Sequence, residues 1–186
     1  MARKEKEKMK HIYYVRHGET ESNVAMVFSG SGNDTVLTET GKKQAKMAGE
    51  ALRGKGIEII IASPMKRTKQ TAEIIAKQIK FPTEKIKYDD LLVERGFGYY
   101  EGKPHAKMQE DKDAGIKRDM GEDLQDVHDR VLKVIKKIQT GKEKTILVVS
   151  HGGIGRVMRI IDRELSAADF HEVERFENCE IDEFTV

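Results

Sequence analysis

The sequence predicts a three-layer α/β/α sandwich built on a mainly parallel sheet, with an edge strand near the C-terminus. Strand-like and helix-like segments alternate along the chain, which is typical of a parallel sheet covered by helices. The apolar runs at 57–62 and 145–149 have the composition of buried parallel strands. Each run leads into a predicted helix, so both indicate the strand–helix succession of this fold class.

The N-terminal half supplies the first strands and helices. Residues 12–15 (Ile-Tyr-Tyr-Val) predict a short buried strand, and residues 19–24 predict a helical turn before a polar, glycine-containing loop. Thr38 is expected to cap the next helix, because its hydroxyl can accept from a free backbone N–H. After the strand at 57–62, Pro64 is expected at the first position of another helix.

The C-terminal half contains the clearest amphipathic helix, at 124–138, where valine and isoleucine recur on one side. The segment 104–121 is polar, and we expect part of it to be helical. The remaining predictions are a short strand at 86–88, the strand at 145–149, a helix at 154–161, and one or two edge strands within 172–186.

Composition and charge limit the possible classes of protein. The chain has 186 residues, with 34 Lys and Arg against 32 Asp and Glu, so its net charge of +2 does not indicate nucleic-acid binding. Its single cysteine excludes an intramolecular disulfide and favours a reducing compartment, and no apolar run is long enough for a membrane span. We therefore expect a cytoplasmic protein, with a charged flexible tail at 1–10 and a single catalytic domain at 11–186.

Chemically reactive residues follow three of the predicted strands. Arg16 and His17 follow the first, Ser63 and Arg67 follow the second, and His151 follows the last. The carboxyl ends of parallel strands lie at one edge of a sheet, so these side chains should meet there. A helix that begins after His151 would also offer free backbone N–H groups. Arginine forks, imidazoles and a helix N-terminus together predict a phosphate site.

Other chemistries fit these residues less well. A metal site at His17 and His151 is disfavoured by the fixed positive charge of the arginines and by the absence of a His-Glu-x-x-His pattern. Ser150 lacks the Gly-x-Ser-x-Gly elbow of a serine hydrolase. The sequence also lacks a Gly-x-x-x-x-Gly-Lys-Ser/Thr loop for nucleotide phosphates.

Five short motifs occur in order across nearly the whole chain. They are Arg-His-Gly-Glu at 16–19 with Asn23, Leu-Thr-x-x-Gly-x-x-Gln-Ala at 37–45, Ser-Pro-Met-x-Arg-Thr-x-Gln-Thr-Ala at 63–72, Glu94 with Gly-x-x-Glu-Gly at 98–102, and Ser-His-Gly-Gly at 150–153. Together they resemble the motifs of the histidine phosphatase superfamily, also called phosphoglycerate-mutase-like. The resemblance implies phosphoryl transfer through a phosphohistidine intermediate.

The resemblance also implies a role for each residue. His17 would attack phosphorus, while Arg16, Arg67 and His151 would hold the equatorial oxygens. Glu94 would protonate the leaving alcohol and then activate water. Substrate contacts are expected from Arg16, Asn23, Ser29, Gly30, Arg67, His151 and Gly152. An ordinary loop carboxylate at Glu94 and a turn or cap role for Asn23 stay open as alternatives. No metal or cofactor is expected, because the arginines supply the positive charge.

The expected activity is hydrolysis of a small phosphorylated metabolite, with no nucleic-acid or membrane partner. Phosphatase is favoured over mutase because the interval from Glu94 to His151 is short and the sequence ends soon after the last predicted strand. A mutase must exclude water from its intermediate, usually with additional closing segments. The alternatives are a mutase-type phosphoryl transferase, a phosphohistidine protein phosphatase, and a catalytically silent phosphate sensor. The substrate and the oligomeric state stay open.

Overall fold

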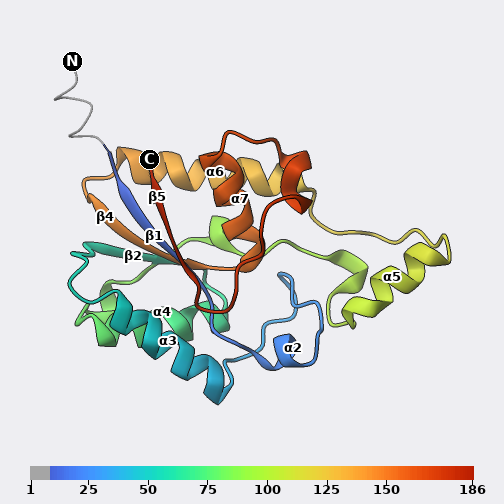
Figure 1. Cartoon of the computed structure of the whole chain (residues 1–186), viewed down its shortest axis with the longest axis horizontal. Helices are drawn as coiled ribbons and strands as arrows, with labels where there is room; N and C mark the ends of the chain where they lie inside the picture. Colours follow the sequence, from blue (N-terminus) through green and yellow to red (C-terminus); the bar gives the residue numbers. More distant parts are fainter. Residues whose placement is uncertain (1–8) are drawn as a thin grey trace.

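A five-stranded sheet with the strand order β3-β2-β4-β1-β5 forms the centre of the computed structural model, which describes residues 9–186 (Figure 1). Strands β1 to β4 are parallel to one another, and β5 runs antiparallel to β1 at one edge. The strands are β1 (His11–Arg16), β2 (Ile59–Ala62), β3 (Lys87–Tyr88), β4 (Thr145–Ser150) and β5 (Ile181–Thr185). The predicted mainly parallel sheet with a C-terminal edge strand is therefore confirmed.

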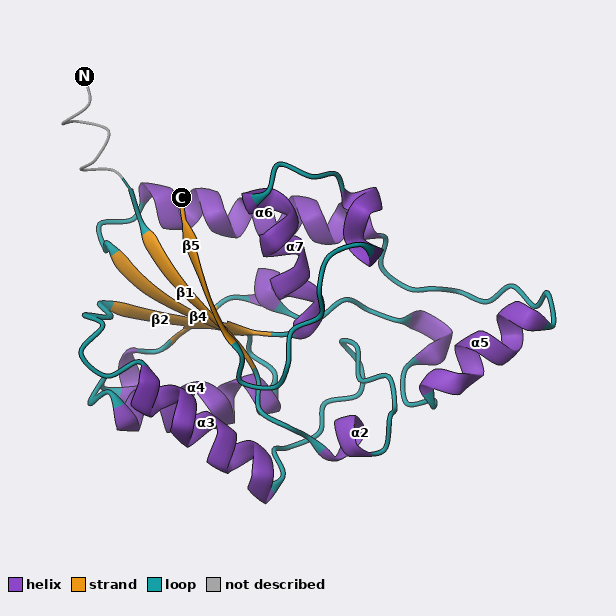
Figure 2. Ribbon diagram, in the orientation of Figure 1, coloured by secondary structure: helices purple, strands orange, loops and turns teal. Residues whose placement is uncertain are grey.

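Helices cover both faces of this sheet (Figure 2). The α-helices are α2 (Glu21–Val24), α3 (Glu39–Ala51), α4 (Lys66–Gln78), α5 (His105–Asp113), α6 (Leu124–Thr140) and α7 (Gly152–Asp162). Short 3-10 helices are η1 (Thr83–Lys85), η2 (Asp90–Leu92), η3 (Gly98–Tyr100) and η4 (Ala167–His171). One face carries α3 and α4 and the other carries α6 and α7, which confirms the three-layer prediction.

Two apolar clusters fill the space between the sheet and the helices. Strand side chains alternate between them, so Tyr14 and Val148 pack toward α6 and α7, whereas Val15 and Val149 pack toward α3 and α4. This alternation explains why the strands of the parallel sheet are continuous apolar runs in the sequence.

Two boundaries differ from the sequence predictions. Helix α4 begins at Lys66 with Met65 as its N-cap, so Pro64 lies before the helix and not at its first position. Lys10 belongs to the folded domain and not to a tail, because it is buried and its ammonium donates to the carbonyls of Gly141 and Glu143 at 2.6 and 2.8 Å. Met9 is exposed, and residues 1–8 of the predicted tail lie outside the described part of the chain.

Strand register brings the predicted site residues to one edge of the sheet. Arg16 at the end of β1 pairs with Ser150 at the end of β4, so the following residues, His17 and His151, are neighbours. The next strand, β2, ends beside β4, and the N–H of Ser63 donates to the carbonyl of Val149 at 3.0 Å.

Within residues 9–186, no helix is long and apolar enough to cross a membrane.

Candidate active site

His17 is fixed at the end of β1 by a close crossing of two backbones. A Cβ on Gly18 would lie 2.5 Å from the carbonyl oxygen of Gly41, and a Cβ on Gly41 would lie 2.1 Å from that of Glu19. Glycine is therefore required on both sides of this crossing. The N–H of Gly18 also donates to the hydroxyl of Thr71 on α4 at 3.1 Å, which anchors the peptide after His17.

The environment of His17 selects one tautomer of a neutral imidazole. Its Nδ1 lies 2.8 Å from the carbonyl oxygen of Gly18, and because a carbonyl only accepts, Nδ1 carries the proton. Nε2 consequently keeps its lone pair. Burial, together with the positive charges of Arg67 and Arg16, holds the pKa of His17 well below its usual value. The ring is therefore a neutral nucleophile at neutral pH.

His151 lies beside His17, with 5.3 Å between the ring centroids. The Nε–H of Arg67 donates to Nδ1 of His151 at 3.3 Å, so this nitrogen is unprotonated. The proton is then on Nε2, which donates to the hydroxyl of Ser63 at 2.9 Å. Burial and the charge of Arg67 hold the pKa of His151 well below its usual value. His151 is thus a neutral ring whose one N–H faces the hydroxyl of Ser63.

Arg67 is fully buried, and the protein holds most of its guanidinium. Besides the bond to His151, its Nη1 donates to Asp34 at 3.1 Å and its Nη2 donates to the carbonyl of Gly30 at 2.8 Å. Nη1 also lies 3.4 Å from the carbonyl oxygen of Asn33. A guanidinium has five N–H groups, so this arrangement leaves one of them for an incoming oxygen.

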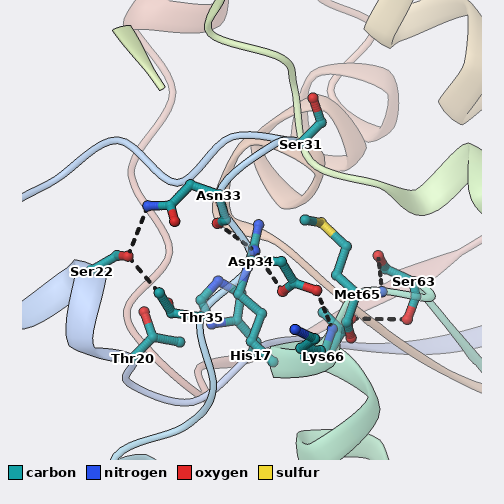
Figure 3. A network of polar contacts seen from close by, with 12 residues as sticks. His17, Thr20, Ser22, Ser31, Asn33, Asp34, Thr35, Ser63, Met65 and Lys66 are labelled. Carbon is teal, nitrogen blue, oxygen red and sulfur yellow. Dashed lines mark hydrogen bonds and ion pairs between the residues drawn. The ribbon is translucent and has the colours of Figure 1, made fainter. Parts of the chain in front are cut away.

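The loop that holds Arg67 is itself tied to two helices (Figure 3). Asp34 accepts from the backbone N–H of Lys66 at 2.7 Å, at the start of α4. Asn33 and Thr35 both contact the hydroxyl of Ser22 on α2, at 3.2 and 3.1 Å. The position of the Arg67 fork therefore depends on this loop as well as on α4.

Arg16 has more of its guanidinium available than Arg67. Its Nη1 donates to the carbonyl of Phe176 at 2.5 Å, but its buried Nε has no partner among residues 9–186. The Cα of Gly152 faces this group so closely that an added Cβ would lie 3.4 Å from Nε. A buried N–H without a partner costs free energy, and a bound anion would supply the missing acceptor. Arg16 is therefore the more available anion clamp of the two arginines.

Glu94 lies on the loop after η2, on the side of the site formed by α7. Its carboxylate accepts from the N–H of Gly153 at 3.1 Å and from the N–H of Arg95 at 2.9 Å. A Cβ on Gly153 would come within 2.5 Å of Glu94, so glycine allows this approach. The first turn of α7, predicted to face a phosphate, thus also positions the carboxylate. The structure thus places Glu94 at the edge of the sheet where His17 and His151 lie.

The predicted substrate-contact residues lie around this centre in different ways. Gly30 contacts Arg67 through its carbonyl, and Gly152 lies against Arg16. The hydroxyl of Ser29 is buried without a hydrogen-bond partner among residues 9–186. Asn23 takes part in the capping box of α2, the alternative left open for it, and it also accepts from Asn178 at 3.3 Å.

Two residues of this site, Asp34 and Asn178, are missing from the sequence prediction. Asp34 was part of a predicted polar turn, and only the fold shows that its carboxylate pairs with Arg67. Asn178 lies in the C-terminal segment, where edge strands were expected, and its amide donates to the carbonyl of His17 at 3.0 Å. No spacing rule connects either residue to the histidines. Their roles come from long-range contacts.

This arrangement can carry out phosphoryl transfer. It combines a neutral nucleophilic ring nitrogen, a positively charged surrounding and a carboxylate on the opposite loop. Positive charge and positioned donors stabilise the charge that develops on the transferred phosphoryl group. Within residues 9–186, no group of three or more His, Cys, Asp and Glu side chains is arranged to hold a metal ion.

Comparisons with known proteins identify the family and the fold of the chain. The family model described as histidine phosphatase superfamily (branch 1) matches residues 12–186. The chain is 35% identical over 145 residues to "Uncharacterized phosphatase PhoE" of Bacillus subtilis, covering 77% of this chain and 72% of that protein. It is 34% identical over 156 residues to "Probable phosphoglycerate mutase GpmB" of Salmonella newport, covering 77% and 70%. The solved structure of Bacillus stearothermophilus YhfR superposes with a TM-score of 0.82 at 26% identity, covering 94% of this chain and 90% of that one.

Proposed function

The chain belongs to the histidine phosphatase superfamily (branch 1), and from this premise we propose that it hydrolyses small phosphate monoesters through a phosphohistidine at His17, without a metal ion. The observation that supports this proposal most strongly is the tautomer of His17. With Nδ1 donating to the carbonyl of Gly18, the lone pair of Nε2 is free for in-line attack.

In the first half-reaction, Nε2 of His17 forms a bond to phosphorus while the bond from phosphorus to the ester oxygen breaks. Glu94 enters this step protonated and transfers its proton to that oxygen, so the alcohol leaves neutral and Glu94 becomes a carboxylate. Arg16 and Arg67 donate to the non-bridging oxygens, and His151 joins them when its Nε2–H exchanges the hydroxyl of Ser63 for a phosphate oxygen. In the second half-reaction, Glu94 takes a proton from water, the new oxygen–phosphorus bond forms, and the nitrogen–phosphorus bond breaks. Phosphate leaves, and both His17 and Glu94 return to their starting states.

The charge of the site supports an anionic substrate and a reaction without metal. Arg16 and Arg67 provide two fixed positive charges beside His17, and both lower its pKa. This is the role that a divalent cation takes in many other phosphoryl-transfer enzymes. The proposed partner is therefore a small phosphorylated metabolite. The single cysteine of the chain favours a reducing compartment, so we place the reaction in the cytoplasm.

The test is hydrolysis of p-nitrophenyl phosphate by the purified protein in the presence of EDTA. We expect turnover with EDTA present, and loss of turnover in the His17→Ala variant. Strict dependence on an added divalent metal would contradict the proposed mechanism. A protein that is stabilised by phosphate but shows no turnover with any ester would instead be the phosphate sensor.

Mutase activity is the second candidate, because GpmB, at 34% identity, carries the name of a phosphoglycerate mutase. Both activities pass through the same phosphohistidine and differ in whether water or a second alcohol accepts the phosphoryl group. The distinguishing assay supplies a labelled phosphate ester together with unlabelled hydroxyl acceptors. We expect the label in inorganic phosphate. Recovery of most of it in an acceptor ester would identify a mutase.

A further inference from the structure

The turn at Asn178 and Cys179, near the C-terminus, forms hydrogen bonds with the backbone around the proposed nucleophile, His17. Nδ2 of Asn178 donates to the carbonyl oxygen of His17 at 3.0 Å. The backbone N–H of Cys179 donates to the carbonyl oxygen of Arg16 at 3.1 Å and lies 3.4 Å from that of His17. The carbonyl groups of Arg16 and His17 are thus held by residues about 160 positions away in the sequence.

The same amide of Asn178 also reaches Asn23. Its Nδ2 lies 3.3 Å from Oδ1 of Asn23, so the two hydrogens of one –NH₂ group serve His17 and Asn23. The orientation of the Asn178 amide is unambiguous, because the carbonyl of His17 can only accept. Two hydrogen bonds through Asn178 therefore connect the amide of Asn23 to the backbone carbonyl of His17.

Asn23 is oriented with equal certainty. Its Oδ1 accepts from the backbone N–H of Thr20 at 3.0 Å and lies 3.1 Å from the hydroxyl of the same residue. A backbone N–H can only donate, so the atom facing it is the amide oxygen. With Oδ1 held by Thr20 and Asn178, the Nδ2 end of Asn23 is its free end. No acceptor among residues 9–186 takes its hydrogens.

We propose that Asn178 is a positioning residue that fixes the amide of Asn23 so that Nδ2 donates to the bound phosphate. The inference depends on the proposed function, because it assumes that Asn23 contacts the phosphate. The capping box of α2 alone does not account for the arrangement, since its two hydrogen bonds involve only Thr20 and Asn23. The contact from Asn178 is additional to the cap and joins it to the peptide of His17.

A double-mutant cycle with Asn178→Ala and Asn23→Ala tests this role. The probe is inorganic phosphate, and its Kd is measured by NMR or calorimetry for the wild-type protein, both single variants and the double variant. Loss of one hydrogen bond of this kind corresponds to roughly a tenfold change. We expect Asn178→Ala to raise the Kd about tenfold in the wild-type background and by less than about twofold in the Asn23→Ala background.

A purely structural role would give a different pattern. If Asn178→Ala raises the Kd by the same factor in both backgrounds, or leaves it unchanged in the wild-type background, the inference is wrong. Ser166→Ala is the control for general loss of stability, because it removes a 2.7 Å hydrogen bond to Asp169 in the exposed cap of η4. We expect this control to lower the free energy of unfolding without changing the Kd for phosphate.

The binding cycle and the turnover assay separate the two proposals. If the wild-type protein hydrolyses no phosphate ester while the cycle shows the expected coupling, the proposed function fails and the role of Asn178 stands. If turnover occurs and the coupling is absent, the role of Asn178 fails and the proposed function stands. The side-chain ¹⁵N signal of Asn23 provides an independent readout. It should shift when phosphate is added to the wild-type protein, but not in Asn178→Ala.

Discussion

The two buried histidines make the stability of this protein sensitive to mild acid. His17 and His151 are 4% and 0% exposed, and burial together with Arg67 lowers the pKa of each well below its usual value. In the unfolded chain both rings return to a pKa of about 6.5. At pH values between the native and the unfolded pKa, these histidines are protonated in the unfolded state and neutral in the native state. Stability from these rings is therefore complete above about pH 6.5 and falls as the pH decreases below that value.

The size of this effect follows from the number of protons. Each histidine contributes a slope of up to about 1.4 kcal/mol per pH unit, so between about pH 7 and about pH 5 one ring accounts for at most about 2 kcal/mol. Both rings together account for at most about 4 kcal/mol over the same interval. Carboxylates in the unfolded chain titrate mainly below about pH 4.5, so they contribute little in this window.

Urea unfolding of the wild-type, His17→Gln and His151→Gln proteins measures the slope. Glutamine is polar and does not titrate, and it can donate to the carbonyl that Nδ1 of His17 contacts. We expect the loss of unfolding free energy between about pH 7 and about pH 5 to be smaller in each variant than in the wild-type protein, by up to about 2 kcal/mol. Other histidines, such as His105, whose pKa is also lowered by burial, contribute equally to all three proteins. A His17→Gln protein with the wild-type slope would refute the conclusion that His17 is held neutral.

Two further predictions concern the surroundings of the site, and a third concerns a buried lysine far from it. Asp34→Asn leaves the buried charge of Arg67 without its 3.1 Å partner, and urea unfolding should show a loss of about 3 kcal/mol. Glu94→Gln should lower kcat more for an alkyl phosphate than for p-nitrophenyl phosphate, because the alkoxide needs the proton more; equal losses with both esters would argue against Glu94 as the acid. Lys10→Met removes ammonium bonds of 2.6 and 2.8 Å far from the site, and should cost about 2 kcal/mol in unfolding while leaving kcat/KM unchanged.

The fold could be predicted from the sequence because its signals are local. The apolar runs that became β2 and β4 need two buried faces, and the helix predicted at 124–138 shows its apolar side in its spacing. The predicted start of α4 is wrong by two residues, because the fixed φ of proline fits an extended segment before a helix as well as the first turn of a helix. Lys10 was assigned to a tail because its charge hides the pairing of its backbone with Val186.

The site was predicted as far as strand ends determine it. Arg16, His17 and His151 each follow a strand directly, so the parallel register alone brings them together. Asp34 and Asn178 depend on the paths of two loops, which no local pattern determines. The sequence also does not predict how many N–H groups of Arg67 are left for a ligand, because one of them donates to the carbonyl of Gly30.

The central claim is that Nε2 of His17 receives the phosphoryl group. The most direct measurement is rapid acid-free quenching of the protein during turnover of a ³²P-labelled ester, followed by mapping of the labelled peptide. We expect label that survives alkali, is lost in acid, and lies on the peptide containing His17, with none in His17→Gln. Label on another residue, or continued turnover by His17→Gln, would contradict the account.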